Sequence, residues 1–201
     1  MGDAQKFTLS GALNRLVSAD MNGDGKLDAV FTNTLNDNAY VLLNQSTLET
    51  FAFGAPIVLT TSFEPWGVEV GDIDGDGDVD ILTNNRNRPV PVASELNMNI
   101  FLNNGAATPV FTRADIPLTQ PGRNVRIGDL DGDSKPDIAI TGFDENVSPP
   151  LSQVRILENT NCFKPPILNT GPLTICAGQT IRLESIPAAN VTFTWKESGV
   201  A

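Results

Sequence analysis

Apolar residues along this chain occur in short runs, and Asp, Asn and Gly fill the gaps between the runs. Residues 68–70 read VEV, residues 79–83 read VDILT, and residues 27–33 read LDAVFTN. These runs alternate or cluster β-branched residues and show no helical period. The pattern therefore predicts β-strands joined by polar turns.

Three of the polar gaps share one nine-residue frame. The frame reads DMNGDGKLD at 20–28, DIDGDGDVD at 72–80 and DLDGDSKPD at 129–137. The first aspartates of successive copies lie 52 and 57 residues apart. A period of this length indicates a propeller or solenoid unit, so the chain is expected to repeat one structural element three times.

The chemistry of the frame predicts a calcium site. Hard oxygen donors stand at alternate positions, a glycine at the sixth position permits a sharp turn, and position 7 supplies a backbone carbonyl. So many like charges in one loop require a cation. We expect up to three Ca²⁺ ions, and loop three to bind most weakly because Ser134 replaces the turn glycine. The expected ligands are Asp20, Asn22, Asp24, Lys26, Asp28, Asp72, Asp74, Asp76, Asp78, Asp80, Asp129, Asp131, Asp133, Lys135 and Asp137.

An EF-hand loop opens in the same way but places a bidentate Glu at position 12, where this chain has Phe31, Thr83 and Ile140. Other features recur with the loops. A Phe-centred segment precedes them (FGAP at 53–56, and Phe111), and strands ending in Asn-rich sequence (YVLLNQ, NIFLNNG, VRILENT) follow them. The chain thus resembles the FG-GAP or VCBS-type repeat, which builds β-propeller blades in integrin α subunits and secreted bacterial proteins. The resemblance implies an all-β fold of four-stranded blades, with calcium between strands 1 and 2. Three blades form an incomplete ring, because propellers usually have 4–8.

The domain organisation follows from where the repeats stop. Residues 1–160 are expected to form the blades, 161–172 a Pro-rich linker, and 173–201 the beginning of a partial β-sandwich that resembles an immunoglobulin-like domain. Such a sandwich needs about 100 residues, so this one is truncated. The spacing of Cys162 and Cys176 permits a disulfide without demanding one.

The charge of the chain has a local origin. The formal net charge is −11, yet 11 of the 24 acidic residues occupy the side-chain ligand positions of the loops, which leave out position 7, and the remaining 13 balance the 13 basic residues. The acidity therefore gives no basis for binding nucleic acid. There is no His, which excludes imidazole catalysis. Residues 1–15 lack an apolar signal core, and no run has the length of a membrane span.

These features favour a secreted or cell-surface, calcium-stabilised module for adhesion, recognising a protein or glycan, and not an enzyme. The alternatives are an accessory propeller of a secreted carbohydrate-active enzyme and a structural spacer. A partner is expected on the face opposite the calcium loops, because the connections there vary in length. Trp66 is read either as a stacking residue or, preferably, as packed between blades. The candidate segments are 33–38, 84–97 and 142–153, with Phe63, Trp66, Arg86, Arg88 and Arg123.

Overall fold

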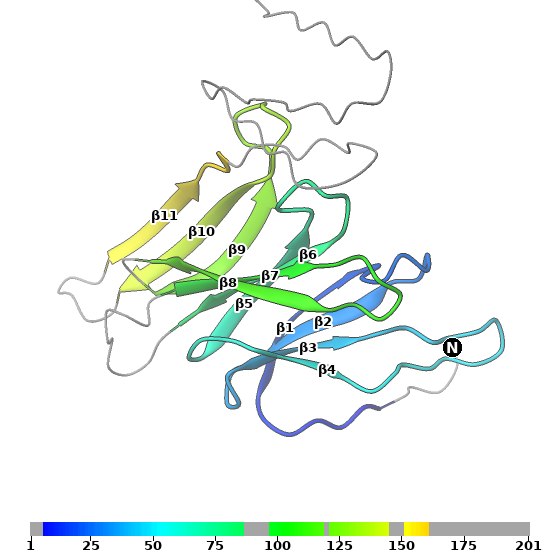
Figure 1. Ribbon diagram of the computed structural model, residues 1–201. Helices are drawn as coiled ribbons and strands as arrows, with labels where there is room; N and C mark the ends of the chain where they lie inside the picture. Colours follow the sequence, from blue (N-terminus) through cyan, green and yellow to red (C-terminus); the bar gives the residue numbers. More distant parts are fainter. Residues whose placement is uncertain (1–5, 87–96, 119–120, 145–150, 161–201) are drawn as a thin grey trace, which may run out of the picture.

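The computed structural model describes residues 6–86, 97–118, 121–144 and 151–160, which form three antiparallel sheets and no helix (Figure 1). The first sheet, blade 1, contains β1 (Leu13–Ala19), β2 (Asp28–Asn33), β3 (Asn38–Leu42) and β4 (Ile57–Thr60). Blade 2 contains β5 (Pro65–Gly71), β6 (Asp80–Asn85), β7 (Asn97–Asn103) and β8 (Phe111–Pro117). Blade 3 contains β9 (Gly122–Gly128), β10 (Asp137–Asp144) and β11 (Leu151–Leu157). The predicted all-β fold of repeated blades is confirmed, and none of these sheets closes into a barrel.

The order of the strands separates the two ends of each blade. In blade 1, β1 and β2 pair from Ala19↔Asp28 onward, so the acidic loop joins them at one end. The next pair, β2 and β3, meets at Asn33↔Asn38, so its turn lies at the other end. The same arrangement holds for β5, β6 and β7 in blade 2. All three acidic loops therefore share one end, and the connections of variable length share the opposite end.

The third of these connections is shorter than the sequence suggests. Residues 142–153 were expected to form one long loop, but β10 continues to Asp144 and β11 starts at Leu151. Thr141 lies opposite Val154, and Phe143 lies opposite Ser152. Thr, Phe and Val favour a pleated conformation, so pairing continues beyond the point where the sequence of blade 2 turns.

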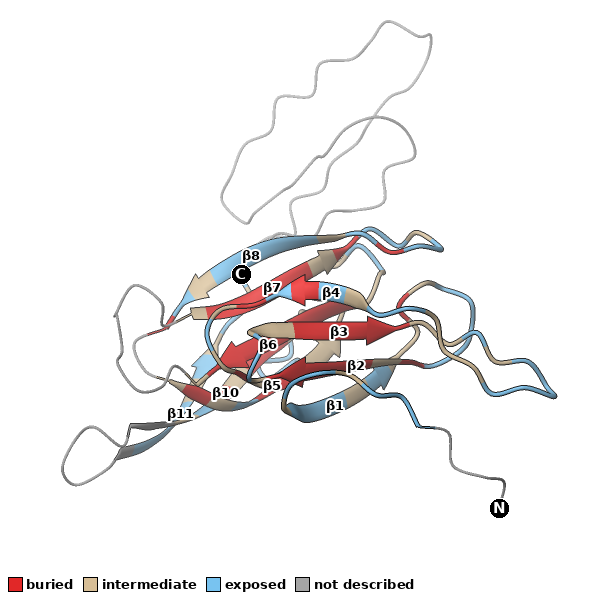
Figure 2. Cartoon of the chain, turned by 90° about the horizontal axis from the view of Figure 1, so that it is seen from below, coloured by how far each residue is buried: buried red, intermediate tan, exposed pale blue. Residues whose placement is uncertain are grey.

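The apolar core lies between the blades. One cluster joins Val30, Ala39 and Val41 of blade 1 to Val68, Ile81 and Phe101 of blade 2. A second cluster joins Leu82, Met98 and Ile100 of blade 2 to Val125, Ile138 and Ile140 of blade 3. Figure 2 shows the buried residues concentrated in the middle strands, while β1 and β8 are largely exposed. Burial of apolar area between successive blades is thus the main stabilising force.

The first strands of the three blades lie together at the inner edge. Strand β5 contacts both β1 and β9. The guanidinium of Arg15 in β1 donates from Nη2 to Asn124 Oδ1 in β9 at 3.0 Å. A cavity of about 100 Å³ lies among these strands. The blades therefore fan out from a shared inner edge, as the blades of a propeller do.

Candidate metal centre

The backbone of each acidic loop turns through left-handed conformations at positions 4 and 6. Gly75 and Gly77 have φ of 78° and 95°, and the corresponding residues of loop one are also glycines at positive φ. In loop three, position 6 is Ser134, which nevertheless adopts φ 69°. A residue with a Cβ pays an energetic penalty in this region. Ser134 is therefore a strained substitute for the glycine that the loop requires.

The first aspartate organises the loop by accepting two backbone hydrogen bonds. Asp72 Oδ1 accepts from Gly75 N at 2.8 Å, and its Oδ2 accepts from Gly77 N at 3.0 Å. Asp20 and Asp129 accept the same pair of bonds in their own loops. Each oxygen of Asp72 and Asp129 accepts one of these bonds and keeps a second lone pair, whereas Asp20 Oδ1 also accepts from Asn22 N and Asp24 N. The aspartate can therefore hold the turn and still offer an oxygen to a metal ion.

Two loops bring three carboxylates together. One oxygen each from Asp72, Asp74 and Asp76 lie within 4.8 Å of one another, and the same holds for Asp129, Asp131 and Asp137. Oxygens bound to one calcium ion at 2.3–2.6 Å are separated by no more than about 5 Å. These acidic clusters could therefore hold a metal ion, and their hard oxygen donors suit Ca²⁺ better than a transition metal.

Loop one, all of whose residues are described, does not bring three carboxylates this close. Its third position is the neutral Asn22, and Lys26 Nζ lies 3.6 Å from Asp24 Oδ2. Loop three has a similar contact, because Lys135 Nζ lies 2.6 Å from Asp133 Oδ2. The hydrogen bond from Lys135 lowers the pKa of Asp133. The position-7 lysines thus partly neutralise their loops, whereas loop two has Asp78 at this position.

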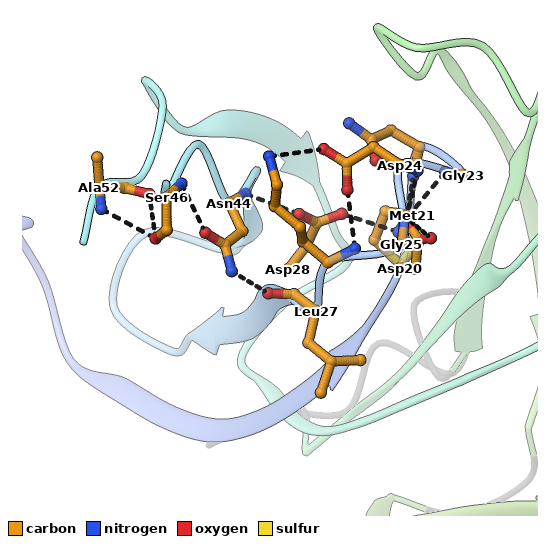
Figure 3. A network of polar contacts seen from close by, with 12 residues as sticks. Asp20, Met21, Gly23, Asp24, Gly25, Leu27, Asp28, Asn44, Ser46 and Ala52 are labelled. Atoms are coloured by element: carbon orange, nitrogen blue, oxygen red, sulfur yellow. Dashed lines mark hydrogen bonds and ion pairs between the residues drawn. The ribbon is translucent and has the colours of Figure 1, made fainter. Parts of the chain in front are cut away.

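The ninth aspartate is buried and ties the loop to the body of its blade. Asp80 Oδ2 accepts from Ile73 N at 2.8 Å inside the loop, and Oδ1 accepts from Asn103 N at 2.9 Å at the end of β7. Asp28 and Asp137 make the same two kinds of bond. Figure 3 shows Asp28 between Met21 and Asn44. This carboxylate therefore joins strands 1, 2 and 3 of every blade.

The carboxylates of loop two have raised pKa values, so ionising them without a metal ion is unfavourable. Desolvation raises the pKa of Asp80 to about 6, although its two backbone hydrogen bonds act in the opposite direction. Desolvation and the neighbouring carboxylates also raise the pKa of Asp74 and Asp78. A nearby positive charge would reverse these shifts. The electrostatics of loop two therefore fit a bound cation.

An asparagine at or just after the end of the third strand links loops one and two to the following blade. Asn103 Nδ2 donates to Val79 O in its own loop at 3.0 Å and to Met21 O in loop one at 2.9 Å. Asn159 Nδ2 donates to Ile73 O in loop two at 2.9 Å. The sequence showed Asn at this place in each repeat, but it gave no partner. The signal available in the sequence was that Asn recurs at one position of the repeat. Asn44, Asn103 and Asn159 each lie two residues after the third-strand residue that pairs with the residue following the ninth aspartate.

The loops of blades 2 and 3 lie next to each other. A cavity of about 330 Å³ separates them, and Asp72, Asp74, Asp129, Ser134 and Lys135 are among its lining residues. The two carboxylate clusters therefore border the same solvent-accessible space at one end of the blades.

These loops, their spacing and their blades can be compared with known proteins. Residues 20–83 match the FG-GAP-like repeat family. The match starts at the first ligand position of loop one and ends in β6, just after loop two. FG-GAP-like repeats are typical of extracellular, adhesion-type β-propeller modules. No curated protein matches this chain.

The expected site residues are found in three settings. The acidic clusters contain six of the expected ligands, and most of the remaining side chains hold the loop backbone or belong to a lysine–aspartate pair. The carboxylate of Asp78 lies next to Gly105 instead. Trp66 belongs to neither inter-blade core; its ring is half-buried beneath Arg86, whose Cζ lies 4.7 Å from the ring centroid.

Among the described residues, no helix has the length and hydropathy to span a membrane. Arg88, Cys162, Cys176, the linker at 161–172 and the segment 173–201 lie outside the described residues.

The raised pKa of Asp80 predicts an unusual pH dependence without metal. A carboxyl whose pKa is about 6 in the folded state and 3.8 unfolded destabilises the fold once both states are ionised. In chelator, the unfolding free energy should fall by about 2 to 3 kcal/mol between pH 4 and pH 7. Calcium should remove this fall, because binding favours the ionised form. Denaturant titrations at several pH values measure it; a flat profile in chelator would contradict the burial argument.

The left-handed Ser134 predicts a stabilising substitution. Ser134→Gly should relieve the strain at φ 69°, raise the unfolding free energy by about 0.5 to 1 kcal/mol and tighten calcium binding at loop three. The control is Ser152→Gly in β11, where glycine should destabilise. Calorimetric calcium titration and thermal melts would test this, and weaker binding by Ser134→Gly would count against the geometry.

The link between blades predicts unequal costs for two similar substitutions. Asn103→Ala leaves the carbonyls of Met21 and Val79 without this donor and should cost about 2 to 3 kcal/mol. Asn44→Ala removes a bond to Leu27 of its own loop, at an exposed site, and should cost about 1 kcal/mol or less. Chemical denaturation distinguishes them. Equal costs would mean that the contact between blades adds nothing.

Proposed function

We propose that this chain is a calcium-stabilised extracellular module that binds a protein or glycan partner through the end of the blades opposite the acidic loops. Its calcium ions would sit in loops two and three, with a weaker site in loop one, whose carboxylates do not gather as closely. This order replaces the one expected from the sequence, in which Ser134 made loop three the weakest site. The proposal also assigns it a binding role without catalytic activity.

The support for calcium is the donor set. Two groups of three carboxylate oxygens fit the separation that calcium ligands require, and the raised pKa values of Asp74, Asp78 and Asp80 show that loop two disfavours the metal-free ionised state. Calcium at a hundredfold excess over its dissociation constant would add about 2.7 kcal/mol per site. The similarity of residues 20–83 to FG-GAP-like repeats agrees with an extracellular setting, where calcium is abundant.

The support for a partner site at the other end is the pair formed by Arg86 and Trp66. The guanidinium covers the indole ring at 4.7 Å, and Phe63 nearby in the sequence is 43% exposed. Aromatic and arginine side chains that present flat surfaces are enriched in protein interfaces and stack well on sugars. This pair is the single observation that favours binding at this end.

The loops themselves support a structural role for the metal. In each loop the first and ninth aspartates already accept backbone N–H groups on both oxygens. A general base needs an oxygen aimed at a substrate proton. Carboxylates committed to the turn and to an ion serve that purpose poorly, which is why we assign the loops to stability.

The partner end is tested with a substitution that leaves the loops intact. The labelled protein is screened on a glycan array and a panel of immobilised matrix proteins with calcium present. Arg86→Ala should weaken the strongest binding by about tenfold and leave the melting temperature nearly unchanged. The matched control is Arg126→Ala, which removes another exposed arginine, one that pairs with Glu69 at the inner edge.

The opposite result is equally clear. If Arg86→Ala binds normally while Asp72→Ala abolishes binding in a protein that remains folded, the acidic loops recognise the partner directly. The partner end is then assigned wrongly.

A further inference from the structure

The contact between blades is built twice from equivalent positions. Pairing places Ala39 of β3 and Met98 of β7 at the same point of their sheets, and both are fully buried against the next blade. Met21 and Ile73, the second residues of loops one and two, are 1% and 5% exposed. Their carbonyls accept from Asn103 and Asn159 of the following blade. Equivalent residues thus join the outer face of blade 1 to blade 2 and the outer face of blade 2 to blade 3.

Blade 3 presents the same face without a cover among the described residues. Val154 is equivalent to Met98 and is 71% exposed; Ile156 is equivalent to Ile100 and is 55% exposed. Leu130, the second residue of loop three, is 56% exposed. Strand β11 pairs with β10 alone in this part of the chain, whereas β3 and β7 each also pair with a fourth strand. Blade 3 therefore offers an apolar face and a strand edge.

Blade 1 presents the complementary side. Thr34 N donates to Ala12 O, as Arg86 N donates to Glu64 O one blade later, each at 2.9 Å. Leu59 of β4 lies five residues before the acceptor Glu64, and Phe7 lies five residues before the equivalent acceptor Ala12. Phe7 therefore has the position relative to blade 1 that Leu59 has relative to blade 2. Residues 6–8 thus occupy the place of a fourth strand from a preceding blade, and Phe7 is 44% exposed.

The polar groups match as well. Asn103 uses both amide hydrogens, one on its own loop and one on the loop of the preceding blade. Asn44 donates to Leu27 O of its own loop, the equivalent of the first of these bonds. The equivalent of the second bond needs a carbonyl at the position of Met21 in a preceding blade, and Leu130 supplies that position.

We propose that a second copy of this chain docks on the outer face of blade 3. Residues 6–8 of the second copy pair with β11 as its fourth strand. Because Leu59 pairs with Ala39, Phe7 of the copy lies opposite Val154. Asn44 of the copy donates to the carbonyl of Leu130.

The described blades of two copies joined in this way at both ends number six. That number lies within the 4–8 blades of closed propellers, and a head-to-tail contact that closes on itself yields a finite dimer. Closure buries the exposed apolar face and leaves the strand edge of β11 paired, which removes a site of non-specific aggregation.

Sedimentation of the full chain at micromolar concentrations with calcium tests the proposal. We expect a species of twice the 21.5 kDa chain mass. Val154→Asp should weaken association by about tenfold or more, because a charge enters an apolar contact. Val110→Asp, which changes a residue that is 62% exposed in another region, is the matched control and should associate normally.

A cross-linking experiment fixes the register. Phe7→Cys and Val154→Cys are prepared as separate proteins, each with Cys162 and Cys176 replaced by Ser, and then mixed and oxidised. Paired strand residues lie 4.5–5.5 Å apart at Cα, within the range of a disulfide, so a covalent heterodimer should form. A monomer at all concentrations overturns the proposal, as does a dimer unaffected by Val154→Asp. A monomer whose melting temperature falls with Val154→Asp also overturns it, since its own chain then covers the face.

Discussion

The structure depends on a buried carboxylate that satisfies two distant backbone amides. In each blade the ninth aspartate of the acidic loop accepts one hydrogen bond from a backbone N–H within the loop. It accepts a second from the backbone N–H of an asparagine at or just after the end of the third strand, as Asp80 does with Ile73 and Asn103. Burial makes this arrangement costly, since it raises the pKa of Asp80 to about 6. A cation bound by the neighbouring carboxylates would offset that cost. In the proposed calcium-bound form, blade geometry and metal affinity are then two aspects of one interaction.

The same interaction reaches across blades. Asn103 places its backbone N–H on Asp80 and its side-chain amide on Met21 of the preceding loop. An ion bound in one loop would therefore also act on the contact with the neighbouring blade. Apolar packing supplies most of the free energy of this contact, while the polar bonds set its register. Arg86 and Trp66, which stack on each other, lie at the opposite end of the blades from this network.

The sequence predicted the fold well because its strongest signal is local. The spacing of Asp and Gly within nine residues specifies the turn, and the strands on either side alternate visibly. The left-handed position of Ser134 followed from the same frame. The bonds from Asn103 and Asn159 to the preceding loops did not follow, because they join residues 82 and 86 positions apart. The contacts of Lys26 and Lys135 depend on side-chain direction inside the turn, and the length of β10 depends on cross-strand pairing. Neither the lysine contacts nor the length of β10 can be inferred from the recurrence of the nine-residue frame.

Amide hydrogen exchange with and without calcium tests this view most directly. The amides of Met21, Ile73 and Leu130, and those of Asn44, Asn103 and Asn159, donate to the ninth aspartates. If the carboxylate couples metal to blade, calcium slows exchange at both groups of amides, most strongly in blades 2 and 3. If calcium leaves the exchange of Asn103 and Asn159 unchanged while it protects the loop amides alone, metal binding is confined to the loops and the coupling is wrong.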